Sequence, residues 1–462
     1  MTEEFFGVLS LKTSYGSLKK KPLYKCCYKQ NNIYDSILIP YQQKHIGFYK
    51  HSSEMYVSFR KDGEFGSLEK VFGPVEDEEH FFQYQLSMHH LYSVQKQWKH
   101  VVPKMSVKDE QKTNDFIFTI DPEGSKDLDD GFSITQLPTK ELFVKVYISN
   151  VPLFLEMNQC WENLTLRPST VYLPGRNIPI LRQDFANDCC SLREGTFRNC
   201  IVASFLIAPE KKTFLSFHNE QVFISKNFSY TDPQLLEHSD YKILQRESGE
   251  TDSHKVVEYW MLQFNQEVGN SLSEGYIRST EKLNHPFFDF IGKYEKIGEN
   301  DSTLYHEALK RYRYAHASSP IRRLIDIYNL TFLQEVLGLE KFCDATLEKV
   351  RISKEDLDKI NKDMTSIKKV QMRCQWIDVC RKKCPFESMG MVMSRELISC
   401  HQYRYMIFFP KEYLVKSYKT YNEYRIGDYY LFTFRYFPMM ASWTNKIRID
   451  IMGEKKELKP IE

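Results

Sequence analysis

The segment FTIDPEGSKDLDDGFSI, residues 118–134, places four aspartates in a short loop between two apolar stretches. They are Asp121, Asp127, Asp129 and Asp130. Carboxylates this close repel one another unless water solvates them or a cation neutralises them. Strand-like residues on both sides argue against a loose surface loop, and hard oxygen ligands suit Mg²⁺ or Mn²⁺. The spacing lacks the alternating oxygens of an EF-hand calcium loop. Two interpretations remain, a solvated acidic turn and a divalent metal site.

The composition is that of a folded chain with several domains. The 462 residues are 42% hydrophobic and 27% charged, which excludes a disordered chain and fits roughly two to four domains. The net charge is only +2, so a site for a polyanion must come from local clustering of basic side chains. Aromatic residues make up 14%; most are expected in the core, and some are candidates for stacking on nucleic-acid bases.

The cysteine pattern and the N-terminal residues predict a cytoplasmic protein. The 11 cysteines include no CxxC pair, and reduced thiols are the simplest interpretation. Cys374, Cys380 and Cys384 form the nearest thing to a cluster, but they lie on an expected helix without other ligands, so a metal role there is not favoured. Neither a signal-peptide core nor an apolar run of about 18 residues occurs, so we expect no membrane association.

Both ends of the chain have the pattern of small β-barrels. Residues 1–95 contain short strand-like segments separated by turn residues and followed by a helix from about residue 76 to 94. The segments are FFGVLSL, SILIPY, HIGFYK and EMYVSF. Residues 384–462 return to short strands, namely ESMGMVMS, YRYMIFF, DYYLFTFRYF and KIRIDIM. Both patterns predict an OB-type barrel.

The middle of the chain, residues 96–383, predicts an α+β domain. Its strands come mainly first, around the aspartate loop and in two long apolar segments that end near Tyr230. Helical spacing of apolar residues follows, with helices expected at 301–312, 320–337 and 353–383. A catalytic-looking centre between two barrels suggests ligand clamps on either side of an active site.

The second motif is YRYAHASSPIRRLIDIYNL, residues 312–330. Ser319 is a good helix cap and Pro320 suits the first helical position, which would put Arg322 and Arg323 in the first helical turn. A helix N-terminus attracts anions, and an arginine fork there can grip a phosphate. The alternative is an exposed basic turn with a salt bridge, for instance to Asp326.

The third motif is TVYLPGRNIP, in which Tyr172 comes just before Pro174 and Gly175. Proline and glycine restrict and punctuate the backbone, so this loop is rigid enough to present the Tyr172 ring to a base. A tyrosine packed within the loop explains the pattern equally well. Together, carboxylates, arginine and aromatic rings suit hydrolysis of a phosphodiester, which requires neutralisation of developing charge.

Several blocks resemble the ribonuclease II and ribonuclease R family, whose members, with the eukaryotic exosome exonuclease, share the RNB domain. TIDPEGSKDLDDGFS resembles the family's signature loop, and YAHASSPIRRLID resembles its YTHFTSPIRRYAD. TVYLPGRNIPIL, CCSLREG and EYWMLQFN resemble three further blocks in the family's order. The resemblance covers most of residues 107–340. It implies an α+β RNB catalytic domain flanked by small OB-type β-barrels.

The resemblance also implies a function and roles for individual residues. It implies a hydrolytic, processive 3′→5′ exoribonuclease that uses Mg²⁺, with Mn²⁺ as a substitute. The substrate would be single-stranded RNA with a free 3′ end, the products nucleoside 5′-monophosphates, and the protein a monomer. The implied roles are Asp129 and Arg322 in catalysis, Asp121, Asp127 and Asp130 at the metal, and Tyr172, Tyr230, Glu258 and Arg323 on RNA.

The chain departs from the family pattern where supporting residues are expected. Tyr147 replaces a histidine, Asn150 an aspartate and Leu324 a tyrosine, and Asn329-Leu330 replaces the usual His-Arg. These changes spare the implied metal ligands and the phosphate arginine, so they put the rate in question more than the mechanism. The alternative function is a catalytically weak or inactive RNA-binding protein on the same fold. A structural or assembly protein with a solvated acidic loop is a third hypothesis.

Overall fold

The chain forms two compact units. The computed structural model describes residues 3–30, 33–42, 53–91, 98, 101–104, 115–209, 211–282, 290–298, 305–412 and 414–452. The first unit comprises Met1–Tyr92, Tyr172–Arg176 and Ser366–Glu462, and the second comprises Ser93–Val171 and Asn177–Thr365. Both chain ends therefore belong to one unit, whereas the sequence predicts three successive domains with boundaries near residues 95 and 383.

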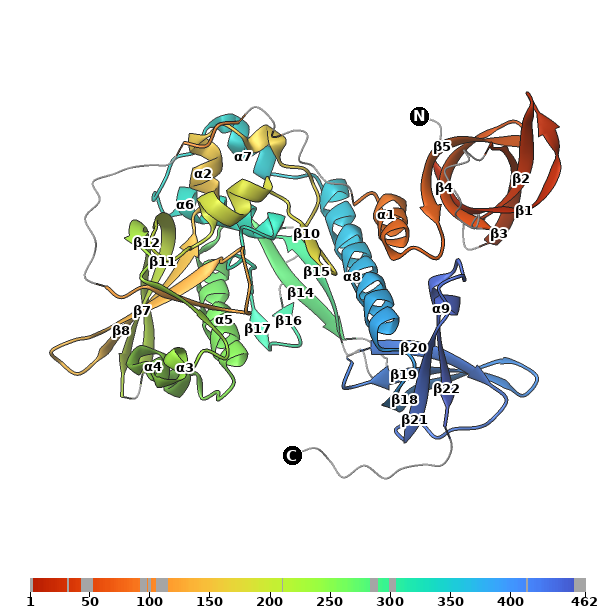
Figure 1. Ribbon diagram of the computed structural model, residues 1–462. Helices are drawn as coiled ribbons and strands as arrows, with labels where there is room; N and C mark the ends of the chain where they lie inside the picture. Colours follow the sequence, from red (N-terminus) through yellow and green to blue (C-terminus); the bar gives the residue numbers. More distant parts are fainter. Residues whose placement is uncertain are drawn as a thin grey trace. The chain divides into compact units, whose positions relative to one another are not determined.

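The N-terminal strands close into a barrel in the order β1-β2-β3-β5-β4, as Figure 1 shows. The strands are β1 (Phe5–Leu18), β2 (Lys21–Gln30), β3 (Ile33–Pro40), β4 (Glu54–Asp62) and β5 (Phe65–Pro74). Alternating residues point into the barrel, where Leu9, Ile39 and Phe59 are fully buried. The barrel is confirmed; β2 and β5 were not expected, and the HIGFYK segment lies outside the described residues.

One helix, α1 (Glu78–Met88), follows this barrel and is shorter than the helix expected over 76–94. The Asp77 carboxylate caps it by accepting hydrogen bonds from two backbone N–H groups, and two glutamates occupy its first turn. Tyr84 of the helix stacks on Tyr56 of β4, with ring centroids 4.5 Å apart. This aromatic contact holds the helix against the outer face of the barrel.

The C-terminal strands form one antiparallel sheet in the order β20-β19-β18-β21-β22. They are β18 (Phe386–Ser399), β19 (Gln402–Phe409), β20 (Leu414–Thr420), β21 (Tyr429–Tyr436) and β22 (Ile447–Ile451), with the short helix α9 (Trp443–Lys446) before β22. The second barrel expected here is a barrel-like sheet without closure among the described strands. The buried Lys446 ammonium binds the Val75 and Pro438 carbonyls, at 2.6 and 2.5 Å, and so joins this sheet to the first barrel.

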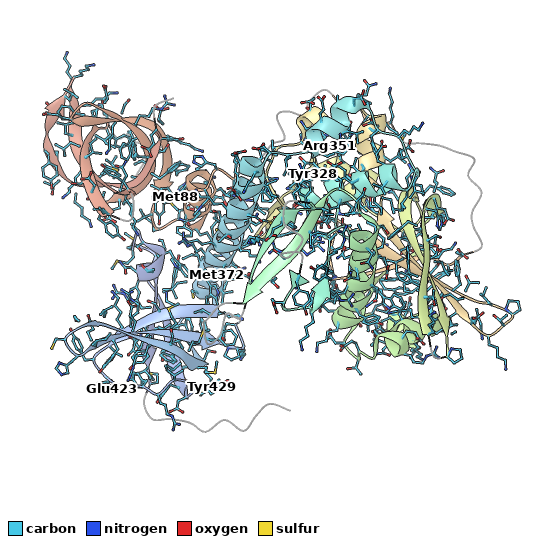
Figure 2. All side chains as sticks on the ribbon, turned by 180° about the vertical axis from the view of Figure 1, so that it is seen from behind. Met88, Tyr328, Arg351, Met372, Glu423 and Tyr429 are labelled. Atoms are coloured by element: carbon cyan, nitrogen blue, oxygen red, sulfur yellow. The ribbon has the colours of Figure 1, made fainter. Side chains whose placement is uncertain are left out.

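The second unit is built on a six-stranded sheet in the order β12-β11-β8-β7-β6-β13. Its strands are β6 (Phe118–Asp121), β7 (Asp130–Gln136), β8 (Leu142–Ser149), β11 (Phe197–Ala208), β12 (Lys211–Phe223) and β13 (Lys226–Ser229). The helices α5 (Ser253–Ser271) and α6 (Leu324–Val336) supply much of the core beside this sheet. Trp260 of α5, for example, packs edge-on against Phe205 of β11. Tyr328 of α6, labelled in Figure 2, is buried in the same core.

The remaining elements are shorter, apart from α8 (Lys354–Lys383), which confirms the helix expected over 353–383. They are α2 (Val151–Met157), η2 (Trp161–Asn163), β9 (Val171–Leu173), β10 (Arg176–Ile178), η3 (Phe185–Cys190), α3 (Pro233–Glu237), α4 (Ser239–Ser248), β14 (Tyr276–Lys282), β15 (Phe290–Lys296), β16 (Tyr305–His306), β17 (Arg311–Tyr312) and α7 (Asp344–Val350). In the part of the chain that the structure describes, no helix combines the length and apolar character needed to cross a bilayer.

The helix expected over 301–312 is wrong. Its described residues form two short strands, β16 and β17, which belong to a four-stranded sheet with β14 and β15. Lys310 and Arg313 both have positive φ, 52° and 53°, which interrupts any right-handed helix. The helix expected over 320–337 exists, but it begins only at Leu324.

Candidate active site

The aspartate loop connects two neighbouring strands of the six-stranded sheet. Asp121 is the last residue of β6 and Asp130 the first of β7. Hydrogen bonds to residues 191 and 192 hold the loop in place. Leu128 N–H donates to Ser191 Oγ at 3.0 Å, and Leu192 N–H donates to the Leu128 carbonyl at 3.0 Å. The loop is therefore anchored in the core, which excludes the loose acidic turn.

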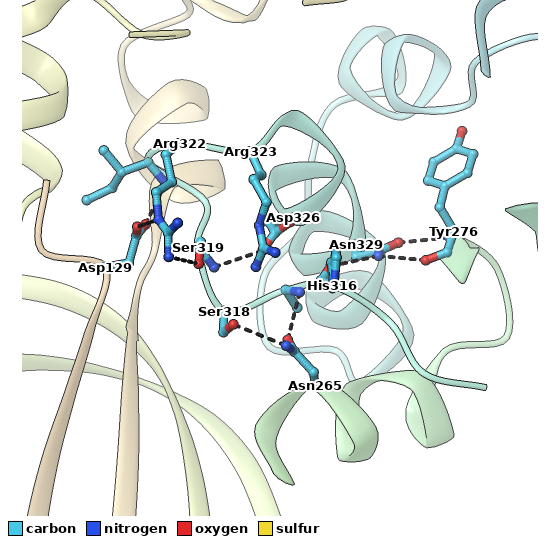
Figure 3. A network of polar contacts seen from close by, with 12 residues as sticks. Asp129, Asn265, Tyr276, His316, Ser318, Ser319, Arg322, Arg323, Asp326 and Asn329 are labelled. Atoms are coloured by element: carbon cyan, nitrogen blue, oxygen red, sulfur yellow. Dashed lines mark hydrogen bonds and ion pairs between the residues drawn. The ribbon is translucent and has the colours of Figure 1, made fainter. Parts of the chain in front are cut away.

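Asp129 receives two hydrogen bonds from the SPIRR segment, as Figure 3 shows. The Ile321 backbone N–H donates to its Oδ1 at 2.8 Å, and Arg322 Nε donates to its Oδ2 at 3.0 Å. The side chain of Asp129 is 2% exposed, whereas that of Arg322 is 44% exposed. Burial raises the pKa of Asp129 to about 7, and the Arg322 charge opposes that rise. Arg322 thus pairs with a buried carboxylate while nearly half of its own side chain is exposed.

Two further aspartates carry oxygens that have no protein partner. Asp121 Oδ2 and Asp130 Oδ2 are both buried and accept no hydrogen bond from any described residue. Burial raises the pKa of Asp121 to about 7, with Arg322 lowering it and Asp127 raising it. Burial also raises the pKa of Asp130 well above its ordinary value, and the charges of Asp121 and Asp129 add to this. The aspartate charges therefore raise one another's pKa values, and the Arg322 charge opposes this rise.

This donor set fits a divalent cation. A buried carboxylate oxygen without a hydrogen bond is costly, and a hard cation is the usual way to satisfy several such oxygens at once. Among the described residues, however, no three carboxylate, imidazole or thiol groups lie in the arrangement of a metal site. The metal roles of Asp121, Asp127 and Asp130 therefore stay predictions supported by the two unpartnered oxygens. Asp127 lies at the partly exposed edge of the loop.

The SPIRR segment forms a single backbone turn, in which the Arg322 and Arg323 N–H groups donate to the Ser319 carbonyl, and helix α6 does not begin there as the sequence predicts. Helix α6 starts at Leu324 and has Arg323 at its N-cap, with φ −131° and ψ 127°, so the capping role expected for Ser319 is wrong. Backbone bonds to a neighbouring segment are the reason: Thr170 N–H donates to the Arg322 carbonyl, and Leu324 N–H donates to the Pro168 carbonyl, both at 2.9 Å. This strand-like pairing places both arginines before the helix rather than in its first turn.

The two adjacent arginines point to different partners. Arg323 Nη2 donates to Asp326 Oδ2 at 2.8 Å, and Asp326 is completely buried. Asp326 Oδ2 also accepts the Ser319 backbone N–H at 2.8 Å, so this aspartate ties the segment to α6. The salt bridge expected at Asp326 is therefore present, formed by Arg323. Arg322 is the arginine that reaches the aspartate loop, and contact of Arg323 with RNA stays a prediction.

The other predicted RNA-binding residues fall in three places. The Tyr230 backbone N–H donates to the Asp121 carbonyl at 3.0 Å, so the half-buried tyrosine lies beside the aspartate loop. Burial raises the pKa of Tyr230 to about 12, and the Asp130 charge adds to this. Glu258 is exposed on α5. Tyr172 belongs to the other compact unit, where its side chain is 40% exposed and its N–H donates to Gln371 Oε1.

The three polar residues that depart from the family pattern, Tyr147, Asn150 and Asn329, are buried and hydrogen-bonded. Tyr147 OH bonds to Ser133 Oγ at 2.9 Å. Asn150 Oδ1 accepts the Leu153 N–H at the start of α2, and its Nδ2 donates to Gln334 Oε1 at 2.8 Å. Asn329 Oδ1 accepts the Tyr276 N–H, and its Nδ2 donates to the Tyr276 and His316 carbonyls. Each departure is thus compatible with a supported site.

Sequence reasoning missed two residues that hold this site. Ser191 supports the aspartate loop, and Asn265 of α5 binds the segment before SPIRR. Their only signal in the sequence is that Ser191 lies in the CCSLREG block and Asn265 closes the EYWMLQFN block. Both contacts join residues more than fifty positions apart, which local patterns do not encode.

Comparison with solved structures shows that this chain has a ribonuclease R-like fold. The structure matches that of "Mycoplasma genitalium RNase R in complex with double-stranded RNA" with a TM-score of 0.70 and 14% identity, covering 97% of this chain and 95% of that one. It also matches "Structure of yeast Ssd1, a pseudonuclease" with a TM-score of 0.66 and 13% identity, covering 94% of this chain and 68% of that one. At these identities the matches establish the fold.

Sequence comparison then identifies a known domain. The RNB domain matches residues 110–240. Ribonuclease R of Ureaplasma parvum is 35% identical over 97 residues, which are 21% of this chain and 14% of the relative. DIS3-like exonuclease 2 of Xenopus tropicalis is 32% identical over 137 residues, which are 29% of this chain and 16% of the relative. The alignments thus cover a small part of these curated relatives. Residues 110–240 therefore match the RNB domain, within a chain that has a ribonuclease R-like fold.

Proposed function

We propose that this protein is a metal-dependent, hydrolytic 3′→5′ exoribonuclease that degrades single-stranded RNA processively and releases nucleoside 5′-monophosphates. The observation that carries the proposal is the pairing of the half-exposed Arg322 with the buried Asp129, in the same loop as Asp121 and Asp130, which each have one buried oxygen without a partner among the described residues. Its fold matches that of an RNase R in complex with RNA. Relatives that share the RNB-domain segment are named ribonuclease R and exoribonuclease 2.

The site supports phosphodiester chemistry through complementary charges. Asp121, Asp127 and Asp130 would hold Mg²⁺, which when bound neutralises negative charge and polarises a phosphoryl oxygen. The partly exposed Arg322 would grip the scissile phosphate, since a planar guanidinium can donate two hydrogen bonds to a phosphate. Asp129 fixes the direction of that fork through its bond to Nε. Tyr230, beside Asp121, is positioned to contact the terminal nucleotides.

An RNA-binding protein without catalysis is the second candidate. The fold also matches Ssd1, which is described as a pseudonuclease. The departures at Tyr147, Asn150 and Asn329 add to this alternative, because they lie in the hydrogen-bonded support of the site. Against it stand the four aspartates and Arg322, which are all present.

A time course on 5′-labelled RNA with a 3′ overhang tests the proposal. The expected result in Mg²⁺ is a ladder that shortens from the 3′ end to a short limit product, with no shortening in EDTA. Internal cuts would contradict the exonucleolytic mechanism. RNA that is bound but never shortened in Mg²⁺ or Mn²⁺ would establish the second candidate. We also propose that the protein is a monomer and that it lies in the cytoplasm. The free cysteines support the second of these proposals.

A further inference from the structure

Asn265 of α5 uses its whole side-chain amide to hold the segment that leads into SPIRR. Its Oδ1 accepts the Ala317 backbone N–H at 2.9 Å. Its Nδ2 donates to the Ser318 hydroxyl at 3.1 Å and to the Tyr314 hydroxyl at 3.0 Å. Asn265 is 2% exposed, and its partners are equally buried. The one amide oxygen and the two amide N–H donors of Asn265 therefore all bind the same segment. No other side chain of this size offers one acceptor and two donors in this arrangement.

The α5 backbone lies against the same segment one turn further on. A Cβ added at Gly269 would come 1.7 Å from the Arg313 carbonyl oxygen, so only glycine permits this approach. Gly269 and Asn265 are four residues apart and occupy the same face of the helix. The helix thus holds the segment both by close backbone contact and by the Asn265 hydrogen bonds.

The segment that Asn265 fixes controls the direction of Arg322. Ser318 is followed by Ser319, whose hydroxyl accepts a hydrogen bond from Arg322 Nη2 at 2.9 Å. The Arg322 Nε bonds to Asp129 on the other side, so the guanidinium is held between the segment and the aspartate loop. Figure 3 shows this order of contacts, from Asn265 through Ser318 and Ser319 to Arg322 and Asp129. A change at Asn265 is therefore transmitted over two residues to the arginine.

We propose that Asn265 is a positioning residue for phosphate binding, acting through the Ser318–Ser319 backbone on Arg322. This inference rests on the proposed function. Asn265 itself touches no phosphate in this scheme; it fixes the loop that aims the arginine. Because a misplacement of about 1 Å in a reacting site can cost on the order of 100-fold in rate, loss of these bonds should affect turnover more than RNA binding.

The first test compares kinetics of Asn265→Ala with a matched control on the same helix. The expected result is a kcat lowered about 10-fold to 100-fold with little change in KM. The control is Ser253→Ala, which removes another buried hydrogen bond of α5, to Tyr241 OH at 2.8 Å, away from the SPIRR segment. It should lower Tm but leave kcat unchanged. Equal effects of both variants on kcat would overturn the proposal. If Asn265→Ala does not fold, Ser318→Ala removes one of the three bonds and should lower kcat less.

A double-mutant cycle separates positioning from general support. Arg322→Lys keeps the charge but loses the planar fork, so activity remains measurable. In this background Asn265→Ala should lower kcat by no more than about 2-fold, because residues that act as one unit are not additive. If Asn265→Ala lowers kcat as much in the Arg322→Lys background as in the wild type, Asn265 acts independently of Arg322 and the proposal is overturned.

Crystal structures of the wild type and Asn265→Ala test the proposal without any activity. The Arg322 Nε to Asp129 Oδ2 bond should be present in the wild type and broken in the variant. An unchanged bond would overturn the positioning role. A wild-type protein that is inactive but shows this structural difference would instead contradict the proposed function and leave the Asn265 contact established.

Discussion

The central residues of this site are buried carboxylates whose charges only an arginine and a cation could balance. Asp130 is the clearest case, because one of its oxygens has no partner among the described residues, and because burial and then the charges of Asp121 and Asp129 raise its pKa. A carboxyl group whose pKa is raised by folding stabilises the protein only at low pH, and this contribution disappears as the pH rises toward the folded pKa. The metal-free site is therefore a source of instability at neutral and alkaline pH.

The first prediction concerns Asp130→Asn without metal. At pH 8 the variant should be more stable than the wild type by roughly 1–3 kcal/mol, because an unpaired buried acid is removed. At pH 5 the gap should be smaller, because burial raises the pKa of Asp130 and acidification therefore favours its neutral form. Urea unfolding in EDTA at both pH values measures the difference in stability between the two proteins. The control is Glu237→Gln, which removes the charge of an exposed residue. Loss of stability at pH 8, or a gap that grows on acidification, would refute the account.

The second prediction separates the two adjacent arginines. Arg322→Ala should lower kcat about 100-fold to 1,000-fold, since it removes a donor aimed at a phosphate. Arg323→Ala should instead cost about 3 kcal/mol of stability, because it leaves the fully buried Asp326 without its cation. Turnover and urea unfolding of both variants decide this. The reverse pattern would show that the roles of Arg322 and Arg323 are exchanged.

At the scale of elements, the loop between β6 and β7 depends on a segment that follows much later in the chain. One of its anchors is Ser191, the residue directly after η3. Local alternation predicts the strands around the loop correctly. It does not predict the anchor, because the Leu128–Ser191 bond joins residues 63 positions apart.

The third prediction tests this anchor. Ser191→Ala leaves the buried Leu128 N–H without an acceptor, which should cost about 1–3 kcal/mol. Because Leu128 precedes Asp129, we also expect kcat to fall about 10-fold or more. The measurements are urea unfolding and turnover in Mg²⁺. Normal turnover together with reduced stability would show that the loop does not need Ser191 to place Asp129.

The start of helix α6 is a feature that the sequence predicts incorrectly. Ser319 and Pro320 are good capping residues, yet α6 begins four residues later at Leu324. The capping rule fails because backbone pairing with residues 168–170 holds Arg323 extended, so the helix starts only after it. The aspartates and Arg322 were nevertheless predicted together, since their chemistry is visible in the sequence. Asn265 was not, because its role depends on how α5 packs against a distant segment.

At the scale of the whole molecule, the residues with predicted roles are distributed over both compact units. The aspartates, Arg322 and Tyr230 lie in one unit, and Tyr172 lies in the other with the barrel and the C-terminal sheet. The resemblance implies that Tyr172 stacks near the 3′ end of RNA. A half-exposed ring in a short two-stranded sheet is suited to stacking.

The fourth prediction follows from this assignment. Tyr172→Ala should change the length of the limit product, because a stacking platform for the last nucleotides is lost, while single-nucleotide release from long RNA continues. Tyr421→Ala, which removes another exposed tyrosine of the same unit, is the matched control and should leave the length unchanged. An unaltered limit product in the Tyr172 variant would remove this tyrosine from the RNA path.

The most direct test of the central claim compares the wild type with Asp129→Asn on single-stranded RNA in Mg²⁺. The account predicts that the wild type releases nucleoside 5′-monophosphates from the 3′ end. Asp129→Asn should bind the same RNA with similar affinity but release products at least about 1,000-fold more slowly, since one buried charge at the site is lost. Equal rates of release from the two proteins would contradict the account.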